Sequence, residues 1–332
     1  MEHPKYIIVI GASAGGMAAL AEVVAQLTED MDVAVFIVMH LSRSSISDYL
    51  VHRLQPHTKL KCQVAKDGMQ IEKGQIYIGI SNHHLLVKKS SIILGNGPEE
   101  NRWRPSIDVL FRSAAVAYNS RTIGIILTGL LDDGTTGMSA IKRSGGTCIV
   151  QDPNEAEFPD MPMSVLNNME VDYCIPLREM GEAISNLIEL DQKEMEVPED
   201  VRIESEIAER VVVNYGNVVQ IGEKSIYACP DCGGGLWSIF KDTKRPDRYR
   251  CHIGHSYSEK DLVVKQGEIL EATLWTALRI MEERRTLLKK MEDSNRKKGL
   301  MNFAKSHQEK VDEFHFNVDK MKELLFETQK TM

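Results

Sequence analysis

The fold is decided by a stretch close to the N-terminus, YIIVIGASAGG, which spans Tyr6 to Gly16. Its first part, Tyr6–Ile10, is apolar and mostly β-branched, as expected of a strand that is buried on both faces of a sheet. The glycines that follow permit a tight turn, and the apolar spacing over Met17–Gln26 predicts a helix after it. The stretch therefore predicts a strand, a turn and a helix, the first unit of an α/β fold.

The same alternation continues to about residue 190. Further runs that are apolar throughout predict buried strands at Val33–Met39, Thr122–Thr128 and Thr147–Gln151. Helical spacing falls between them, around Ser106–Tyr118 and Gly137–Lys142. We therefore expect residues 1–190 to form a doubly wound α/β domain with a mainly parallel sheet. Three short, turn-separated runs instead predict an antiparallel hairpin or an edge extension: Gln75–Ile80, Leu85–Lys89 and Ser91–Leu94.

Composition and charge exclude several classes of protein. The 332 residues suffice for about two domains, and 42% of them are hydrophobic, which allows a sizeable core. The net charge of −8 argues against wrapping of nucleic acid and against general binding to a membrane surface. No apolar run approaches the roughly 18 residues of a membrane span, and the N-terminus lacks the pattern of a signal peptide. We therefore expect a cytoplasmic protein with no nucleic-acid partner and no membrane insertion.

The turn after the first strand matches one of three glycine-loop patterns. A dinucleotide loop would have glycine in place of Ser13, and a phosphate loop would have a lysine after its last glycine. Gly11-x-Ser13-x-Gly15 instead matches the nucleophile elbow, in which a tight turn exposes a serine hydroxyl. The N-terminus of the next helix then offers N–H groups to an oxyanion. A plain glycine-rich turn with Ser13 as helix N-cap stays open as the alternative.

A nucleophilic serine needs a base and an acid that orients the base. His40 ends the second predicted strand, at the edge of the sheet where parallel strands present functional residues. The acid is expected from the loop after Thr122–Thr128, which contains Asp132 and Asp133. The residues alone do not choose between the two aspartates, and either of them could instead cap the following helix.

A second constellation of reactive residues lies in the C-terminal half. Cys229 and Cys232 form a CxxC turn, and CHIGH at residues 251–255 supplies another thiolate and two imidazoles. Zinc prefers four tetrahedral ligands of these kinds, and two paired turns are typical of a zinc ribbon. Reduced cysteines without metal are the alternative, whereas a redox CxxC is disfavoured because no thioredoxin-like pattern surrounds it. We expect a structural zinc on Cys229, Cys232, Cys251 and His255, with His252 as the alternative fourth ligand.

Composition divides the C-terminal half into three parts. Asp191–Glu209 is rich in charge and poor in large apolar residues, so residues 191–224 are expected to be a linker. Residues 225–258 hold the cysteine–histidine cluster and form the zinc-ribbon-like module. Residues 259–332 carry apolar residues at spacings of three and four on both sides of Gly299, which predicts an antiparallel helical hairpin.

Several segments together resemble the catalytic domain of CheB-type chemotaxis methylesterases. They are GASAGG at 11–16, MH at 39–40, RPSIDVLF at 104–111, LTG at 127–129 with DG at 133–134, and VQDP at 150–153 followed by FPDMP at 158–162. They span about residues 5–190 and follow the family order. The resemblance implies an α/β sandwich that hydrolyses glutamyl methyl esters on the signalling domains of methyl-accepting chemoreceptors. Many members also deamidate receptor glutamines, and the chemistry needs no cofactor.

The resemblance also implies roles for individual residues. The nucleophile, the base and the acid correspond to Ser13, His40 and Asp133, the last in preference to Asp132. Lesser roles are expected for three further residues, as oxyanion donors and a substrate contact: Ala14, Leu130 and Arg104. A structural salt bridge is the alternative role of Arg104.

Two features depart from the best-known members of that family. The chain begins directly at the catalytic strand, so relief of inhibition by a phosphorylated receiver domain is not expected within it, and its second half has no counterpart in those members. We expect this C-terminal part to dock a regulatory partner. The alternatives for the whole chain are an esterase of the same fold that acts on another protein or a small ester, and a zinc-ribbon and helical scaffold with a vestigial active site.

Overall fold

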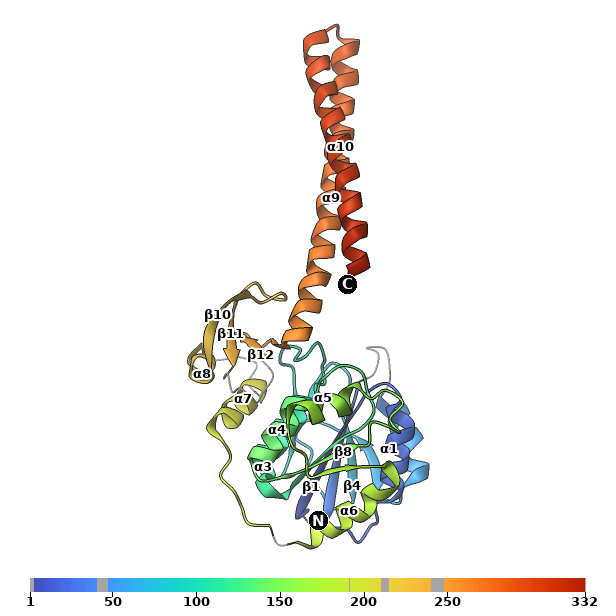
Figure 1. The fold of residues 1–332 in the computed structure, drawn as a ribbon, viewed down its shortest axis with the longest axis vertical. Helices are drawn as coiled ribbons and strands as arrows, with labels where there is room; N and C mark the ends of the chain where they lie inside the picture. The colour runs from blue at the N-terminus through green and yellow to red at the C-terminus, as the bar shows by residue number, and fades with distance from the viewer. Residues whose placement is uncertain (1–2, 41–46, 191, 210–214, 240–247, 332) are drawn as a thin grey trace. The chain divides into compact units, whose positions relative to one another are not determined.

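The computed structural model describes residues 3–40, 47–190, 192–209, 215–239 and 248–331 (Figure 1). Contacts within the chain divide it into two units, Met1–Glu259 and Lys260–Met332. The first unit contains an α/β domain, residues 3–190, followed by a small antiparallel sheet, and the second unit is a pair of long helices.

The α/β domain is built on a seven-stranded parallel sheet with the order β3-β4-β2-β1-β7-β8-β9. Its strand β1 lies between β2 and β7, and all of its residues are buried. This arrangement confirms the predicted doubly wound parallel sheet. The strands are β1 Tyr6–Ala12, β2 Val33–Met39, β3 Lys61–Val64, β4 Gln75–Ile78, β7 Thr122–Ile126, β8 Thr147–Gln151 and β9 Tyr173–Ile175.

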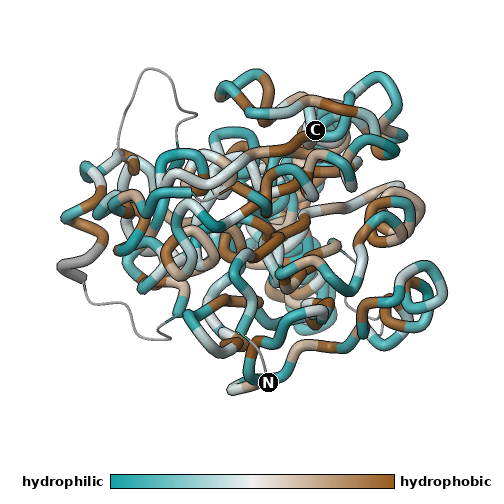
Figure 2. The backbone as a smooth tube through the Cα atoms, turned by 90° about the horizontal axis from the view of Figure 1, so that it is seen from below, coloured by the Kyte–Doolittle hydropathy of each residue, from teal (hydrophilic) through white to brown (hydrophobic). Residues whose placement is uncertain are grey.

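Helices cover both faces of this sheet. Alternate residues of β1 point to opposite faces, so Ile8 packs in a core cluster with α1, α2 and α6, and Ile7 packs in another with α3, α4 and α5. In Figure 2, hydrophilic and hydrophobic residues alternate along the helical coils, as expected of helices with one buried face. The helices are α1 Gly16–Ala25, α2 Ser47–Leu54, α3 Ile107–Tyr118, α4 Thr135–Arg143, α5 Asp160–Asn168 and α6 Met180–Glu189, with short 3₁₀ turns at Gln55–His57, Asn119–Arg121 and Leu177–Glu179.

The predicted antiparallel extension is wrong in one of its three runs. Gln75–Ile78 joins the main sheet as the parallel strand β4, between β2 and β3. Its residues Ile76, Tyr77 and Ile78 are all buried, which is the pattern of a strand covered on both faces. The other two runs form the antiparallel pair β5 His84–Val87 and β6 Ile92–Gly95. Short runs between turns therefore looked alike in the sequence although they belong to different sheets.

The stretch expected to be a linker contains two helices, α7 Glu199–Glu209 and α8 Tyr215–Ile221, and it contacts the α/β domain. The helix α7 packs against α3 and buries Val201 and Ala208. The helix was not predicted because its charged residues indicated a solvated segment, whereas one of them, Glu204, is buried. Residues 191 and 210–214 of the expected linker lie outside the described residues.

A small antiparallel sheet follows, with the order β10-β11-β12-β13. We call residues 222–258 the Cys/His module; its residues 240–247 lie outside the described part of the chain. Trp237 and Ile239 of β11 pack in a small core with residues of α7 and α8. The strands are β10 Gly222–Ala228, β11 Gly235–Ile239, β12 Arg248–Cys251 and β13 Ser256–Ser258.

Five buried charged residues join the Cys/His module to the α/β domain. We call them the Arg–Glu cluster: Glu100, Arg112, Glu204, Arg248 and Arg250. None of them is more than 6% exposed. Arg250 Nη2 of β12 lies 2.8 Å from Glu100 Oε2, and Arg112 of α3 pairs with the same carboxylate. Arg248 Nη1 lies 3.1 Å from Glu204 Oε1. The module is therefore held by ion pairs shielded from water.

The same arginines set the ionisation of both acids. Burial raises the pKa of Glu100, but Arg112, Arg250 and Arg248 outweigh it, so the pKa lies well below its usual value. Burial likewise raises the pKa of Glu204, and the arginines reverse that shift too. Both carboxylates are therefore ionised at neutral pH.

The second unit is the helical hairpin that the sequence predicts. It consists of α9 Glu259–Lys297 and α10 Met301–Thr331, and Gly299 adopts a left-handed φ of 75° between them. Arg284 of α9 lies over the ring of Phe314 of α10 at 5.2 Å. Among the described residues, no helix combines the length and the apolar character needed to cross a membrane.

We predict that Glu204→Gln lowers the stability of the fold in a pH-dependent way. The lowered folded-state pKa of Glu204 means that its ionised form stabilises the fold above the pKa of the unfolded chain, and this stabilisation is lost as the pH falls. The free energy of unfolding should drop by about 3 kcal/mol near pH 7. In urea unfolding, the difference in unfolding free energy from the wild type should narrow progressively as the pH falls below about 4.5, the ordinary pKa of a glutamate in the unfolded chain.

The matched control is Glu206→Gln, which changes an exposed carboxylate on the same helix. Its unfolding free energy should stay within about 0.5 kcal/mol of the wild type at each pH. A pH-independent effect of Glu204→Gln would contradict a role for its charge.

Candidate active site and candidate metal centre

Three predicted site residues lie at the carboxyl edge of the parallel sheet. In the register of β1 and β2, Ala12 pairs with Met39, so Ser13 and His40 each directly follow a paired residue. The His40 N–H donates to Ala12 O at 3.1 Å, which continues the pairing by one step. Because paired strands run about 4.8 Å apart, the two backbones are neighbours at this edge. Asp133 approaches the same place from the loop between β7 and α4.

His40 and Asp133 form a buried hydrogen-bonded pair. His40 Nε2 lies 2.9 Å from Asp133 Oδ2, and the two side chains are 1% and 2% exposed. The ring of Trp103 stacks on the imidazole with a centroid separation of 4.0 Å and an interplanar angle of 7°. Since the carboxylate can only accept, Nε2 carries the proton and Nδ1 keeps its lone pair. Nδ1 is buried and has no partner among the described residues.

Asp133 is held by more donors than His40 alone. Its Oδ1 accepts from Asn101 Nδ2 at 3.0 Å and from Ser106 Oγ at 2.9 Å, and its Oδ2 accepts from the Ile107 N–H at 2.7 Å. Burial raises the pKa of Asp133, but the hydrogen bonds from His40, Ile107 and Asn101 outweigh it, so the pKa is lowered. The residue is an ionised, oriented carboxylate.

Asp132 does not occupy this position. It is half-buried, and its carbonyl accepts the Thr135 N–H at 3.2 Å at the start of α4. The geometry therefore pairs His40 with the aspartate that the family resemblance selects.

Ser13 is pinned between β1 and the loop after β7. Its N–H donates to Thr128 O at 3.0 Å, and its carbonyl accepts the Gly16 N–H at 3.0 Å. Gly15 turns the chain into α1 with a φ of 73°. A Cβ at Gly129 would lie 2.7 Å from the Ser13 Cβ, so only glycine permits this approach. The Ser13 hydroxyl is not hydrogen-bonded to His40 Nδ1 here, and such contacts often tighten only when substrate binds.

The three lesser site residues differ in their surroundings. Ala14 O accepts the Thr128 hydroxyl at 3.1 Å, which fixes the turn beside Ser13. Leu130 is 46% exposed and lies in the loop after β7. Arg104 donates to Asn82 Oδ1 at 3.1 Å and to Gly97 O at 2.8 Å, so its guanidinium holds the loop around it and pairs with no carboxylate among the described residues.

Several residues that support the His40–Asp133 pair were not predicted from the sequence. Asn101 donates both to Asp133 and to Asp108 Oδ2, at 2.7 Å, and so bridges two buried carboxylates. Burial and the charge of Asp133 raise the pKa of Asp108, whose Oδ1 accepts the Gly137 N–H at 2.6 Å in the first turn of α4. No local pattern marks Asn101. Trp103 had one visible signal, a lone tryptophan directly ahead of the Arg104-Pro105-Ser106 segment.

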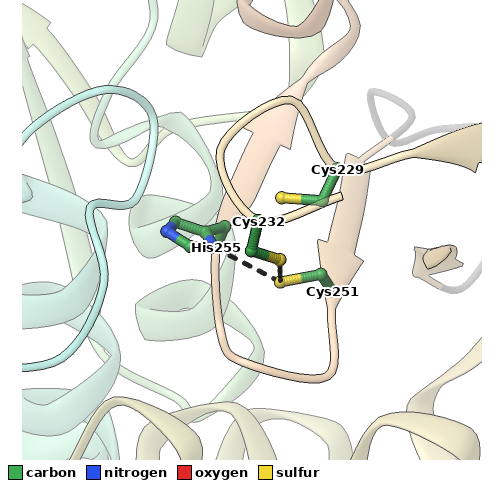
Figure 3. A group of neighbouring side chains, drawn as sticks. All are labelled: Cys229, Cys232, Cys251 and His255. Atoms are coloured by element: carbon green, nitrogen blue, oxygen red, sulfur yellow. Dashed lines mark hydrogen bonds between the residues drawn. The ribbon is translucent and has the colours of Figure 1, made fainter. Parts of the chain in front are cut away.

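The second constellation is brought together in the Cys/His module (Figure 3). Cys229 and Cys232 come from the turn between β10 and β11, Cys251 ends β12, and His255 precedes β13. One ligand atom from each of the four lies within 4.8 Å of every other. In the described part of the chain, none of the six cysteines forms a disulfide. His252 is outside this group, and its ring lies against Gly234.

Comparisons with known proteins identify the family of the α/β domain. Residues 8–184 match the profile of the family described as CheB methylesterase. A protein of Leptospira interrogans, provisionally named a protein-glutamate methylesterase/protein-glutamine glutaminase, is 36% identical over 190 residues, which are 57% of this chain and 96% of the relative. An enzyme of Methanosarcina acetivorans named protein-glutamate methylesterase/protein-glutamine glutaminase 2 is 33% identical over 193 residues, 56% of this chain and 54% of the relative.

A solved structure agrees as well. The crystal structure of the Thermotoga maritima CheB methylesterase catalytic domain superposes with a TM-score of 0.52 and 32% sequence identity, over 55% of this chain and 97% of that one. The parallel sheet, the paired histidine and aspartate beside a serine turn, and a profile match over more than half of the residues thus agree: the chain belongs to the CheB methylesterase family.

Proposed function

We propose that this chain hydrolyses glutamyl methyl esters on the signalling domains of methyl-accepting chemoreceptors in the cytoplasm. The observation that carries the proposal is the buried His40–Asp133 pair beside the Ser13 turn, in a chain of the CheB methylesterase family. The pair leaves one imidazole nitrogen free to take a proton, which is the requirement for activating a serine. Receptor glutamines are a second substrate, since relatives are named for both activities.

In the acylation step, Ser13 Oγ attacks the ester carbonyl while its proton passes to His40 Nδ1. Asp133 stabilises the imidazolium through Nε2, because its carboxylate is ionised and aimed at that nitrogen. The carbonyl oxygen becomes an oxyanion, for which main-chain N–H groups at Ala14 and Leu130 are the donors. Methanol leaves with the proton from His40, and the glutamyl group stays on Ser13 as an ester.

In the deacylation step, water takes the place of the serine. His40 Nδ1 accepts a proton from the water, the hydroxide attacks the acyl carbonyl, and Ser13 Oγ leaves as its proton returns from the imidazolium. The product is a free glutamate side chain. A glutamine substrate follows the same path with ammonia as the leaving group, and neither path needs a cofactor.

Two other functions have less support from the site. A scaffold with a vestigial site would not need to keep Nδ1 free and Asp133 ionised, whereas both properties are present. An esterase for another protein or for a small ester would use the same residues, so comparing methylated receptor with generic esters separates it from the proposal.

We predict that Ser13→Ala abolishes turnover without loss of the fold. Removing Oγ removes the nucleophile, so methanol release from a methylated receptor fragment should fall by at least about 1,000-fold. Ser90→Ala, at an exposed position, is the matched control and should keep wild-type rates. Turnover of Ser13→Ala close to that of the control would remove Ser13 from this role.

We further predict that Asp133→Asn is much more harmful than Asp132→Asn. An amide at position 133 carries no charge for the imidazolium and can present N–H groups to Nε2, which favours the wrong tautomer. The kcat on a small ester should fall by more than about 100-fold for Asp133→Asn and by only a few-fold for Asp132→Asn. The reverse order would show that the other aspartate orients His40.

A further inference from the structure

We propose that the Cys/His module binds a structural zinc ion through Cys229, Cys232, Cys251 and His255, and that the metal fixes the loop Glu100–Trp103 against His40 and Asp133. The metal part of this inference is independent of the proposed function. The coupling part rests on the proposed function and carries it further, because it assigns the C-terminal extension a positioning role at the same site.

The ligand geometry fits zinc. In a tetrahedral site with Zn–S near 2.3 Å and Zn–N near 2.05 Å, two sulfurs lie about 3.8 Å apart, and a sulfur and a nitrogen lie about 3.6 Å apart. Cys232 Sγ and Cys251 Sγ are 3.8 Å apart, and Cys251 Sγ lies 3.5 Å from His255 Nδ1. Three thiols and one imidazole are a zinc donor set, and with four protein ligands a tetrahedral ion has no open position for water.

The backbone around the ligands is shaped as two tight turns. The Cys229 N–H donates to Gly234 O, and the Gly233 N–H donates back to Cys229 O. In the second turn, the Cys251 N–H donates to His255 O at 3.0 Å, and the Gly254 N–H donates to Cys251 O at 3.0 Å. Each turn presents a pair of ligands three or four residues apart in the chain, so the metal would hold the two turns together.

The second turn leads straight into the α/β domain. Ser256, the residue after His255, accepts the Asn101 N–H through its carbonyl at 2.9 Å and forms a β-bridge with Glu100. One residue before Cys251, Arg250 pairs with Glu100 and donates to Gly254 O at 3.1 Å. The strands on either side of the proposed metal therefore hold Glu100 and Asn101 by main chain and by charge.

The loop that they hold supports the reactive pair. Asn101 and Arg102 both adopt left-handed φ angles, of 50° and 68°, which non-glycine residues keep only under constraint from their surroundings. In that conformation the Asn101 amide reaches Asp133, and the Trp103 ring stacks on His40. Asn101 and Trp103 are positioning residues, since they act through Asp133 and His40.

The metal content is tested on the full chain, purified without chelator and analysed by inductively coupled plasma mass spectrometry. We expect one zinc per wild-type chain. Cys232→Ser and His255→Ala should lose the metal on dialysis. Two matched controls should keep it: Cys174→Ser, an exposed cysteine outside the cluster, and His252→Ala, a histidine in the same turn. A wild type without zinc, or retention by His255→Ala with loss by His252→Ala, would overturn the ligand assignment.

The coupling is tested by hydrogen exchange, which needs no activity. In wild-type protein stripped with EDTA, amide exchange over residues 99–107 should become faster, and one equivalent of zinc should restore protection, whereas calcium should not. The kcat on a small ester should fall by about tenfold or more with little change in KM, and zinc should restore it. Unchanged exchange and kcat after full zinc removal would overturn the coupling.

A second variant tests the ion pairs of Glu100 separately from metal binding. Glu100→Gln removes the charge that Arg250 and Arg112 share and leaves all four ligands in place. It should retain one zinc per chain and yet show faster exchange over 99–107 and a lower kcat that zinc does not restore. Wild-type exchange and kcat in this variant would contradict the route through Glu100. If no variant and no metal state of the chain hydrolyses ester, the proposed function fails, while metal content and exchange still decide this inference.

Discussion

The arrangement of the candidate active site depends on one hydrogen bond, between His40 Nε2 and Asp133 Oδ2. The two side chains that it joins are almost fully buried. Because Asp133 is ionised there, the bond settles which imidazole nitrogen holds the proton and which can accept one. The strand order brings His40 and Asp133 together, because β1 lies between β2 and β7. Ser13, His40 and the loop that carries Asp133 follow the carboxyl ends of these three strands, at one edge of the sheet.

The sequence predicted the features that depend on short-range pattern. Buried strands showed as apolar runs, and Ser13 and His40 were located because each follows such a run. The choice of Asp133 over Asp132 came from family resemblance, since two adjacent carboxylates look the same until a partner is placed beside one of them. Asn101 and Trp103 were missed because their partners, Asp133 and His40, are distant in the sequence.

The linker prediction from composition was wrong where a charged residue is buried. The charge-rich stretch Asp191–Glu209 led to the prediction of a linker at residues 191–224, yet one of its charges, Glu204, lies in α7 and pairs with Arg248 and Arg250. Burying a charge is costly unless it is paired, so such pairs persist only where the fold holds both partners. The ion pairs of the Arg–Glu cluster thus join the Cys/His module to the α/β domain. Through Glu100, the same cluster connects the module to the loop beside His40 and Asp133.

Covalent trapping tests whether His40 and Asp133 activate Ser13. The full chain is treated with a serine-reactive fluorophosphonate, and the adduct is mapped by mass spectrometry. We expect one adduct, on Ser13, whose formation slows strongly in His40→Ala although the fold is kept. An adduct on another residue, or equal labelling rates in the wild type and His40→Ala, would contradict it.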